Sequence, residues 1–220
     1  MTVQEAIIER HSVRAYKDET IPEEVRRQLN ALIENCSRDG HLHIFACYDE
    51  PEGFDSRLAH YGSFRNVRNY IVLSGRKDEE FDFRCGYYGE KVVLGAQQLG
   101  LNTCWAALSF NKKNVRALLG PDESLCMVIA LGYGETPGKP HRGKRFEDVT
   151  KANDPPEWFR QGVEAALLAP TALNQQKFRF LYLNGQASLQ TRGIGPCLKT
   201  DLGIVKYHFE IASEHEVKVI

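Results

Sequence analysis

The sequence predicts a fold of the α/β or α+β class, in which strands and helices follow one another along the chain. Two continuous apolar runs, at 69–75 and 125–134, are typical of strands that are covered on both faces. Amphipathic helical patterns lie between the strand-like runs. Strands separated by helices indicate a sandwich in which helices pack against a sheet. With 220 residues, the chain is long enough to bury a sizeable core.

The first 135 residues contain most of the predicted elements. Pro22, Glu23 and Glu24 begin one helix, because proline fits a first helical turn and acidic side chains favour its positive end. Gly100 ends another helix as a C-cap. The predicted helices are 2–9, 23–34, 86–99 and 111–120. The predicted strands are 41–48, 69–75 and 125–134, and 103–110 is either a short strand or an extended loop.

A change of composition at 136–149 separates this part from the C-terminal third. The segment TPGKPHRGKRFEDV combines prolines, glycines and basic residues, which predicts a loop or linker. A helix, a strand and a helix are predicted after it, at 156–168, 178–183 and 201–213. This order repeats that of the helix at 23–34, the strand at 41–48 and the helix at 86–99. The repetition indicates either an internal duplication or a chance recurrence.

Composition and charge exclude several classes of function. The formal net charge is −1, which does not favour a nucleic-acid partner. No apolar run reaches the ~18–20 residues of a membrane span, and the first residues lack the layout of a signal peptide. The six cysteines form no CxxC pair and no metal-ligand spacing. We therefore expect a cytoplasmic protein with reduced thiols, no metal and no membrane partner.

Two segments contain candidate ligand-binding residues. The first is Arg10-His11-Ser12-Val13-Arg14, whose guanidinium and hydroxyl donors suit a phosphate or the polar edge of a ring. A solvated polar turn is the alternative. The second is 169–176, in which small residues permit close approach to the backbone and amides offer both donors and acceptors. Its alternative is a loop whose amides bond its own backbone.

A third candidate is the basic part of the predicted linker. It contains Lys139, His141, Arg142, Lys144 and Arg145. Basic groups in a glycine-containing loop suit a phosphate monoester. A linker that is merely well solvated explains the same residues.

Taken together, these segments resemble the signatures of nitroreductase-family flavoproteins. RHSVRAY resembles the first signature of that family, and APTALNQQKFRF resembles the second. GEKVVLGAQQLGLNTCW resembles its central helix, and MVIALGYGE with the basic loop resembles its late strand and phosphate arm. The resemblance implies an α+β fold with a central, mostly antiparallel sheet flanked by helices. It also implies non-covalent FMN, NADH or NADPH as electron donor, and a small organic acceptor such as a nitroaromatic or a quinone.

The resemblance also implies the residues that contact the flavin. From the first signature these are Arg10, His11, Ser12 and Arg14, and from the second Pro170, Thr171, Ala172, Asn174 and Gln176. Lys144 and Arg145 are the candidates for its phosphate. No residue is nominated as catalytic, although His11 could donate a proton. Trp105 and Phe110 either line the acceptor pocket or belong to the core.

One departure from the family pattern predicts an unusual architecture. In ordinary members the second signature follows soon after the first and reaches the flavin of the partner subunit, whereas here it lies near residue 170. We therefore expect 1–150 to form a nitroreductase-like half and 151–220 to imitate part of the partner. The helix at 201–213 would then pair with that at 86–99, and the chain would hold one FMN as a monomeric pseudo-dimer or as a homodimer.

Two other functions remain open at this point. One is a related flavin enzyme, such as a reductive dehalogenase or a flavin-fragmenting enzyme. The other is a flavin-binding module without catalytic activity.

Overall fold

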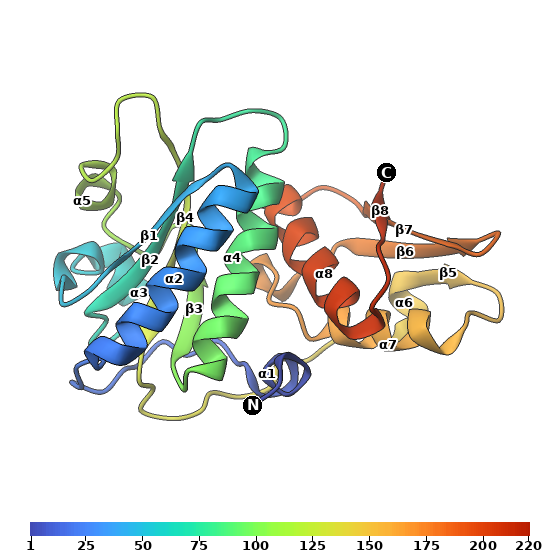
Figure 1. Cartoon of the computed structure of the whole chain (residues 1–220), viewed down its shortest axis with the longest axis horizontal. Coiled ribbons are helices and arrows are strands. Elements are labelled where there is room, and N and C mark those ends of the chain that lie inside the picture. The colour runs from blue at the N-terminus through green and yellow to red at the C-terminus, as the bar shows by residue number, and fades with distance from the viewer.

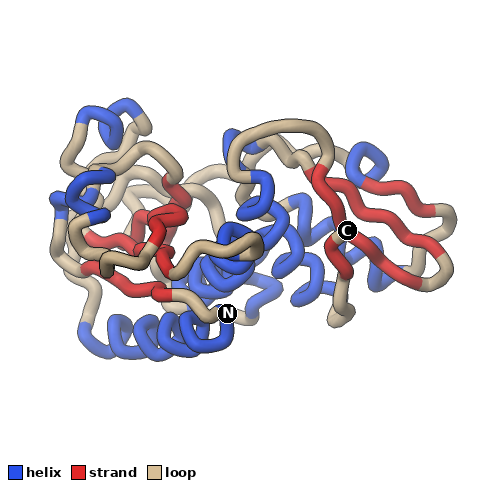
Figure 2. The backbone as a smooth tube through the Cα atoms, turned by 90° about the horizontal axis from the view of Figure 1, so that it is seen from above, coloured by secondary structure: helices blue, strands red, loops and turns tan.

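Two four-stranded sheets lie at opposite ends of an elongated molecule, and the longest helices lie between them (Figure 1). The view from above shows the same division, with strands at both ends and helices in the middle (Figure 2). The computed structural model describes residues 1–220, apart from the side chains of Leu58 and His60. The class is α+β, as the resemblance implies, although the strands divide between two sheets.

The elements follow the predicted order with several additions. The helices are α1 (Val3–Glu9), α2 (Glu23–Gly40), α3 (Arg57–Tyr61), α4 (Phe81–Gln98), α5 (Lys112–Arg116), α6 (Phe146–Val149), α7 (Glu157–Leu167) and α8 (Leu198–Ser213). The strands are β1 (His43–Cys47), β2 (Asn69–Gly75), β3 (Asn102–Ala106), β4 (Ser124–Gly132), β5 (Thr150–Ala152), β6 (Phe178–Leu183), β7 (Gln186–Thr191) and β8 (Lys218–Val219). Among the described helices, none combines the length and apolar character needed to cross a bilayer.

The first sheet is antiparallel throughout, in the order β1-β2-β4-β3. Its central strand β2 is buried along its whole length. Side chains alternate between the two faces of a strand, so Ile71 and Leu73 join the core under α2 and α4. Tyr70 and Val72 join the core on the opposite face. The predicted strand with both faces covered is confirmed.

The second sheet has mixed pairing, in the order β5-β6-β7-β8. β6 and β7 form an antiparallel hairpin, whereas β5 pairs with β6 and β8 with β7 in parallel. The inner face packs on α7 and α8 through aromatic side chains, and the rings of Phe180 and Phe209 stack with centroids 4.8 Å apart. Of these strands, only β6 is predicted from the sequence.

The contact between α4 and α8 joins the two parts, and it is the most extensive contact between any two elements. It depends on two glycines. A Cβ atom at Gly86 would lie 2.0 Å from the carbonyl oxygen of Thr200, and one at Gly203 would lie 2.1 Å from that of Phe83. The predicted pairing of these two helices is confirmed.

The main differences from the predicted elements are at helix ends. α2 continues to Gly40, beyond the predicted end near 34. The ring of Tyr88 packs against Gly40, where a Cβ atom would lie 2.6 Å from it. The left-handed His41 then ends the helix. α4 begins at Phe81, before the predicted residue 86, and the Arg84 guanidinium there pairs with Asp78 (2.9 Å).

Candidate functional site

The two predicted signature segments meet in the middle of the molecule, although they come from opposite ends of the chain. Arg10 follows α1, which packs against both α4 and α8. Its Nη2 atom donates a hydrogen bond to the carbonyl oxygen of Leu168 at 3.4 Å, just before Pro170. The segment after α1 and the loop after α7 therefore lie next to each other and form parts of one candidate site.

The predicted basic loop touches both of these segments. Figure 1 shows the connection from β4 to α6 running along the lower edge of the molecule past α1. Gly138 lies against His11, since a Cβ at Gly138 would be 2.7 Å from the Cβ of His11. Farther along, the backbone N–H of Lys144 donates to Oε1 of Gln176 at 2.7 Å. All three predicted segments thus lie side by side.

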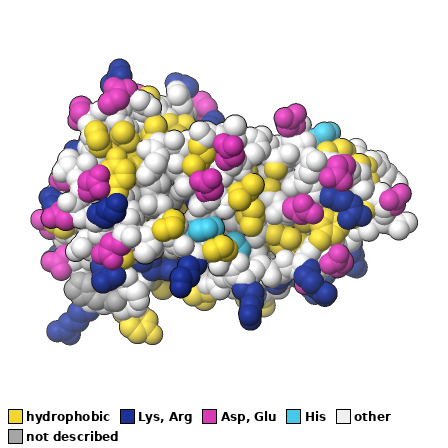
Figure 3. Space-filling view, turned by 90° about the horizontal axis from the view of Figure 1, so that it is seen from below, with side chains coloured by type: hydrophobic (Ala, Val, Ile, Leu, Met, Phe, Trp, Pro, Cys, Tyr) yellow, Lys and Arg dark blue, Asp and Glu magenta, His cyan; other side chains and the backbone are white. Residues whose placement is uncertain are grey.

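Charged side chains of both signs are scattered over the lower face of the molecule. In Figure 3, His side chains lie near the middle of this face between apolar groups, and several Lys and Arg side chains gather along one edge. Acidic side chains lie among them. The charge of this face is therefore mixed, and neither sign dominates it.

Arg10 is buried without a full set of partners. The residue is 3% exposed, and its Nε atom has no hydrogen-bond partner among the described residues. Burial lowers the pKa of Arg10, and the nearby Glu90 carboxylate, with Oε1 at 3.8 Å from Nε, raises it. A buried donor without an acceptor costs roughly 1–3 kcal/mol. This guanidinium therefore has a donor available for a ligand acceptor.

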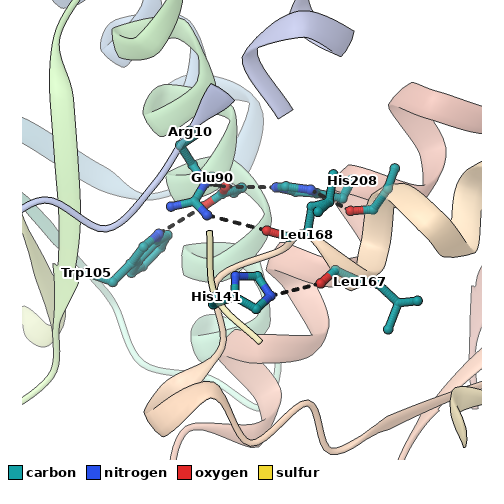
Figure 4. A network of polar contacts seen from close by, with 8 residues as sticks. Arg10, Glu90, Trp105, His141, Leu167, Leu168 and His208 are labelled. Atoms are coloured by element: carbon teal, nitrogen blue, oxygen red, sulfur yellow. Dashed lines mark hydrogen bonds and ion pairs between the residues drawn. The ribbon is translucent and has the colours of Figure 1, made fainter. Parts of the chain in front are cut away.

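A buried polar network surrounds this guanidinium (Figure 4). Glu90 of α4 accepts a hydrogen bond from the indole N–H of Trp105 at 2.9 Å. It also contacts Nε2 of His208 in α8 at 2.9 Å, while Nδ1 of His208 donates to the carbonyl oxygen of Ala165 at 3.0 Å. Glu90 and His208 are both 0% exposed. The network thus links the site to both halves of the chain.

The sequence analysis missed Glu90 and His208. A signal for Glu90 existed, since it shares a buried helix face with Gly86 and Gln97 in an otherwise apolar pattern. A single charged side chain on such a face requires a buried partner. The identity of that partner depends on which helix packs there, and this depends on tertiary structure.

The rest of the first signature lies nearer the surface. His11 is half-buried, and its ring makes no hydrogen bond that the described residues provide. Ser12 is exposed and pairs with Thr103 of β3 through its backbone. Arg14 is also exposed, and its guanidinium lies 6.0 Å from the ring centroid of Phe64. The exposed side chains of Ser12 and Arg14 are therefore accessible to a ligand.

Asp201, in the first turn of α8, anchors the second signature. Its Oδ1 atom accepts from the backbone N–H of Ala172 at 2.9 Å, and Oδ2 accepts from Nε2 of Gln175 at 2.7 Å. Burial raises the pKa of Asp201 to about 6, although both hydrogen bonds lower it. The loop after α7 is therefore fixed to the first turn of α8.

The backbone of this loop is strained. Leu173, Asn174 and Gln176 all have positive φ angles, of 54°, 51° and 43°. Such conformations are uncommon for residues other than glycine, and they cluster at ligand-binding sites. Asn174 is exposed, and its Nδ2 donates to the carbonyl oxygen of Arg142 at 2.8 Å.

Gln176 and Lys144 bind the loops to each other. Gln176 is 1% exposed, and its amide accepts from the Lys144 backbone and donates to the carbonyl oxygen of Leu167 at 3.0 Å. The Lys144 ammonium donates to the carbonyl oxygens of Gln175 (3.1 Å) and Gln176 (2.6 Å). Both polar atoms of the Gln176 side chain and two of the three Lys144 donors therefore hold the loops together.

The remaining predicted side chains have different surroundings. Arg145 is exposed and lies 3.5 Å from Asp148. Trp105 is half-buried at the polar network, whereas Phe110 is buried in the core of the first sheet. Phe110 is thus a core residue and not a pocket residue. The cysteines are all free thiols, and the described residues contain no cluster of His, Cys, Asp or Glu suited to a metal ion.

Two open clefts lie away from this site. One, of about 710 Å³, is lined by residues that include Trp158 and His215 beside the second sheet. The other, of about 730 Å³, lies beside the first sheet near Phe54 and Arg68. Neither is lined by any residue of the two signatures, so the hydrogen-bonding arrangement, and not cleft size, defines the candidate site.

Known proteins resemble this chain in sequence and in structure. A family model described as "Putative TM nitroreductase" matches residues 2–213. A "putative nitroreductase" from Thermotoga maritima has a similar structure (TM-score 0.70, 25% identity), covering 96% of this chain and 83% of that one. A "putative nitroreductase in complex with FMN" from Desulfovibrio desulfuricans has a TM-score of 0.52 and 20% identity, covering 67% of this chain and 94% of that one. No curated protein matches the sequence. The chain therefore belongs to the nitroreductase family described as "Putative TM nitroreductase".

Proposed function

We propose that the chain is an FMN-dependent oxidoreductase that transfers electrons from NADH or NADPH to a small organic acceptor, such as a nitroaromatic or a quinone. The observation that carries this proposal is the Nε–H of Arg10, a buried donor with no hydrogen-bond acceptor among the described residues. It lies where two segments that resemble flavin-binding signatures meet. The polar ring edge and the phosphate of FMN offer the acceptors that such donors require.

The donor set around Arg10 fits this cofactor. Arg10, His11, Ser12 and Arg14 would bind it from one side, and Pro170, Thr171, Ala172 and Asn174 from the other. Its phosphate would lie along the basic loop, near Arg145 and the remaining donor of Lys144. FMN, when bound, supplies the redox chemistry, and the protein binds and orients it. The buried positive charge of Arg10 would favour negative charge on any group that it contacts.

We further propose that 151–220 take the place of a partner subunit. Three observations support this. α8 pairs with α4, Arg10 contacts Leu168 within one chain, and the Desulfovibrio structure covers only two thirds of this chain. The proposal predicts one FMN per chain, whether the protein is a monomer or a homodimer.

The test is the visible absorbance of the purified protein, followed by anaerobic addition of NADH and of NADPH. A flavin spectrum that either nucleotide bleaches would support the proposal. A colourless protein that FMN cannot reconstitute would contradict it. Tight FMN binding without oxidation of either nucleotide would indicate a flavin-binding module. Turnover of halogenated phenols, or loss of reduced FMN in air, would indicate one of the related flavin enzymes.

A further inference from the structure

Glu90 and His208 meet because their helices approach unusually closely. Glu90 lies one turn after Gly86 in α4, and His208 follows Gly203 in α8. The two glycines allow each helix to approach the backbone of the other. Oε1 of Glu90 consequently lies 2.9 Å from Nε2 of His208, with both side chains fully buried.

The contacts of His208 define how many protons the pair contains. Nδ1 faces the carbonyl oxygen of Ala165, which can only accept, so Nδ1 carries a proton. Nε2 faces the Glu90 carboxyl group, so one further proton lies between these two atoms. Whether nitrogen or oxygen holds it, the pair has no net charge. Arg10 and the pair together therefore carry one net positive charge.

The contact with His208 also determines whether Glu90 can form a hydrogen bond with Arg10. His208 occupies Oε1 of Glu90, and the indole N–H of Trp105 occupies Oε2. Nε of Arg10 therefore remains 3.8 Å from Oε1, beyond hydrogen-bond distance, while Nη2 bonds to Leu168. A direct pair of the bidentate kind would use two of the guanidinium donors. In Figure 4, Arg10 and Trp105 lie on one side of Glu90 and His208 lies on the other, and a dashed line joins Arg10 to Leu168.

We propose that His208 is a positioning residue, which occupies the Glu90 carboxylate so that Arg10 keeps its donors and its charge for the bound cofactor. This inference rests on the proposed function, because the cofactor in question is FMN. In this proposal α8, as well as the loop after α7, contributes to cofactor binding. A residue of α8 controls, through α4, a donor that comes from the start of the chain.

The test compares FMN dissociation constants among variants of the full-length protein. His208→Asn retains an amide donor for Ala165 but removes the donor to Glu90, so the freed carboxylate should capture Arg10. We expect FMN binding to weaken by about tenfold or more. Adding Glu90→Gln to this variant removes the carboxylate and should restore most of the affinity. A merely structural role would predict that the second change adds further loss.

Two controls complete the design. Glu90→Gln alone can donate to Nε2 of His208 and accept from Trp105, so its FMN affinity should stay within about threefold of native. Glu210→Gln disturbs the same helix contact, where Glu210 bonds Tyr87 (3.0 Å) and Lys206 (2.6 Å), but it does not touch Arg10. It should leave FMN binding unchanged. Thermal unfolding of each apoprotein shows which variants are folded.

Three results would overturn the inference. The first is native FMN affinity in His208→Asn. The second is weaker FMN binding in the double variant than in His208→Asn. The third is a tenfold loss of FMN affinity in Glu90→Gln alone, a result that can be obtained even if His208→Asn does not fold. Absence of FMN binding by the native protein would overturn the proposed function as well. The native titration therefore separates the two failures.

Discussion

Gly86 of α4 lies directly against Thr200 of α8, so closely that a Cβ atom at Gly86 would be 2.0 Å from the Thr200 carbonyl oxygen. Both partners at this contact belong to the backbone. Neither can turn aside as a flexible side chain would, so the absence of a side chain at Gly86 determines the spacing of the two helices. The same spacing brings together the buried polar groups beside Arg10.

Gly86→Ala should therefore force the two helices apart. We expect the free energy of unfolding to fall by roughly 1–3 kcal/mol or more, as for overpacked cores, measured by urea denaturation. Gly120→Ala is the matched control, because a Cβ there would meet Glu123 at an ordinary 3.6 Å. Equal stability of the two variants would show that the contact relaxes without cost.

Arg10→Ala should weaken FMN binding by roughly 1.5–3 kcal/mol, the usual contribution of a hydrogen bond to a charged group. Titration of the apoprotein with FMN, followed by flavin fluorescence, measures the loss. Arg27→Ala removes an exposed guanidinium that pairs only with Glu24 on α2, and it should bind FMN normally. If both variants retain native affinity, Arg10 does not contact the cofactor.

Asn174 and Gln176 should respond differently to substitution, although both belong to the second signature. Gln176→Leu leaves the Lys144 N–H without its acceptor and removes one of the two donors to the Leu167 carbonyl, which still contacts Nε2 of His141 at 3.0 Å. We therefore expect roughly 1–3 kcal/mol of lost stability and faster proteolysis of the basic loop. Asn174→Ala removes only an exposed hydrogen bond, and it should leave stability nearly native while weakening FMN retention. If Asn174→Ala instead lowers stability while Gln176→Leu lowers only FMN retention, the roles proposed for the two amides are wrong.

Asp201 should make stability depend on pH in an unusual direction. Its pKa is raised from 3.8 to about 6, so between these values the folded protein binds more protons at this site than the unfolded chain does. The contribution of Asp201 is therefore largest below pH 4, and it is lost as the pH rises through 6, by up to roughly 3 kcal/mol. Native protein should lose stability relative to Asp201→Asn as the pH rises from about 4 to 6.5. A constant difference across that range would contradict the raised pKa.

Much of the fold could be predicted because its strands are buried on both faces. β2 and β4 are continuous apolar runs, and both were predicted close to their observed bounds. β7 was missed because its sequence, QASLQT, contains polar residues that face away from the core. The hairpin turn before it, Asn184-Gly185, has positive φ angles of 52° and 79°. Asn-Gly between two strands is a strong hairpin signal, and it would have indicated β7.

The candidate site was predictable in its segments but not in its contacts. The residue types of 10–14 and 169–176 indicated polar ligand binding, and the resemblance indicated which ligand. The pattern could not show that the Gln176 amide bonds Lys144 and Leu167, because that choice depends on how two loops pack. Nor could it show the Glu90–His208 contact, whose members are far apart in the chain and meet only after α4 and α8 have packed.

Two contacts join distant parts of the chain, one between Arg10 and Leu168 and the other between Glu90 and His208. They have a consequence for folding during synthesis on the ribosome. The strands of the first sheet, 43–132, emerge early and can pair with one another as they appear. The face of α4 that contains Glu90 stays without its partner until α8 has left the exit tunnel. The candidate site of a nascent chain therefore stays incomplete until residues 198–213 have emerged and α8 has packed on α4.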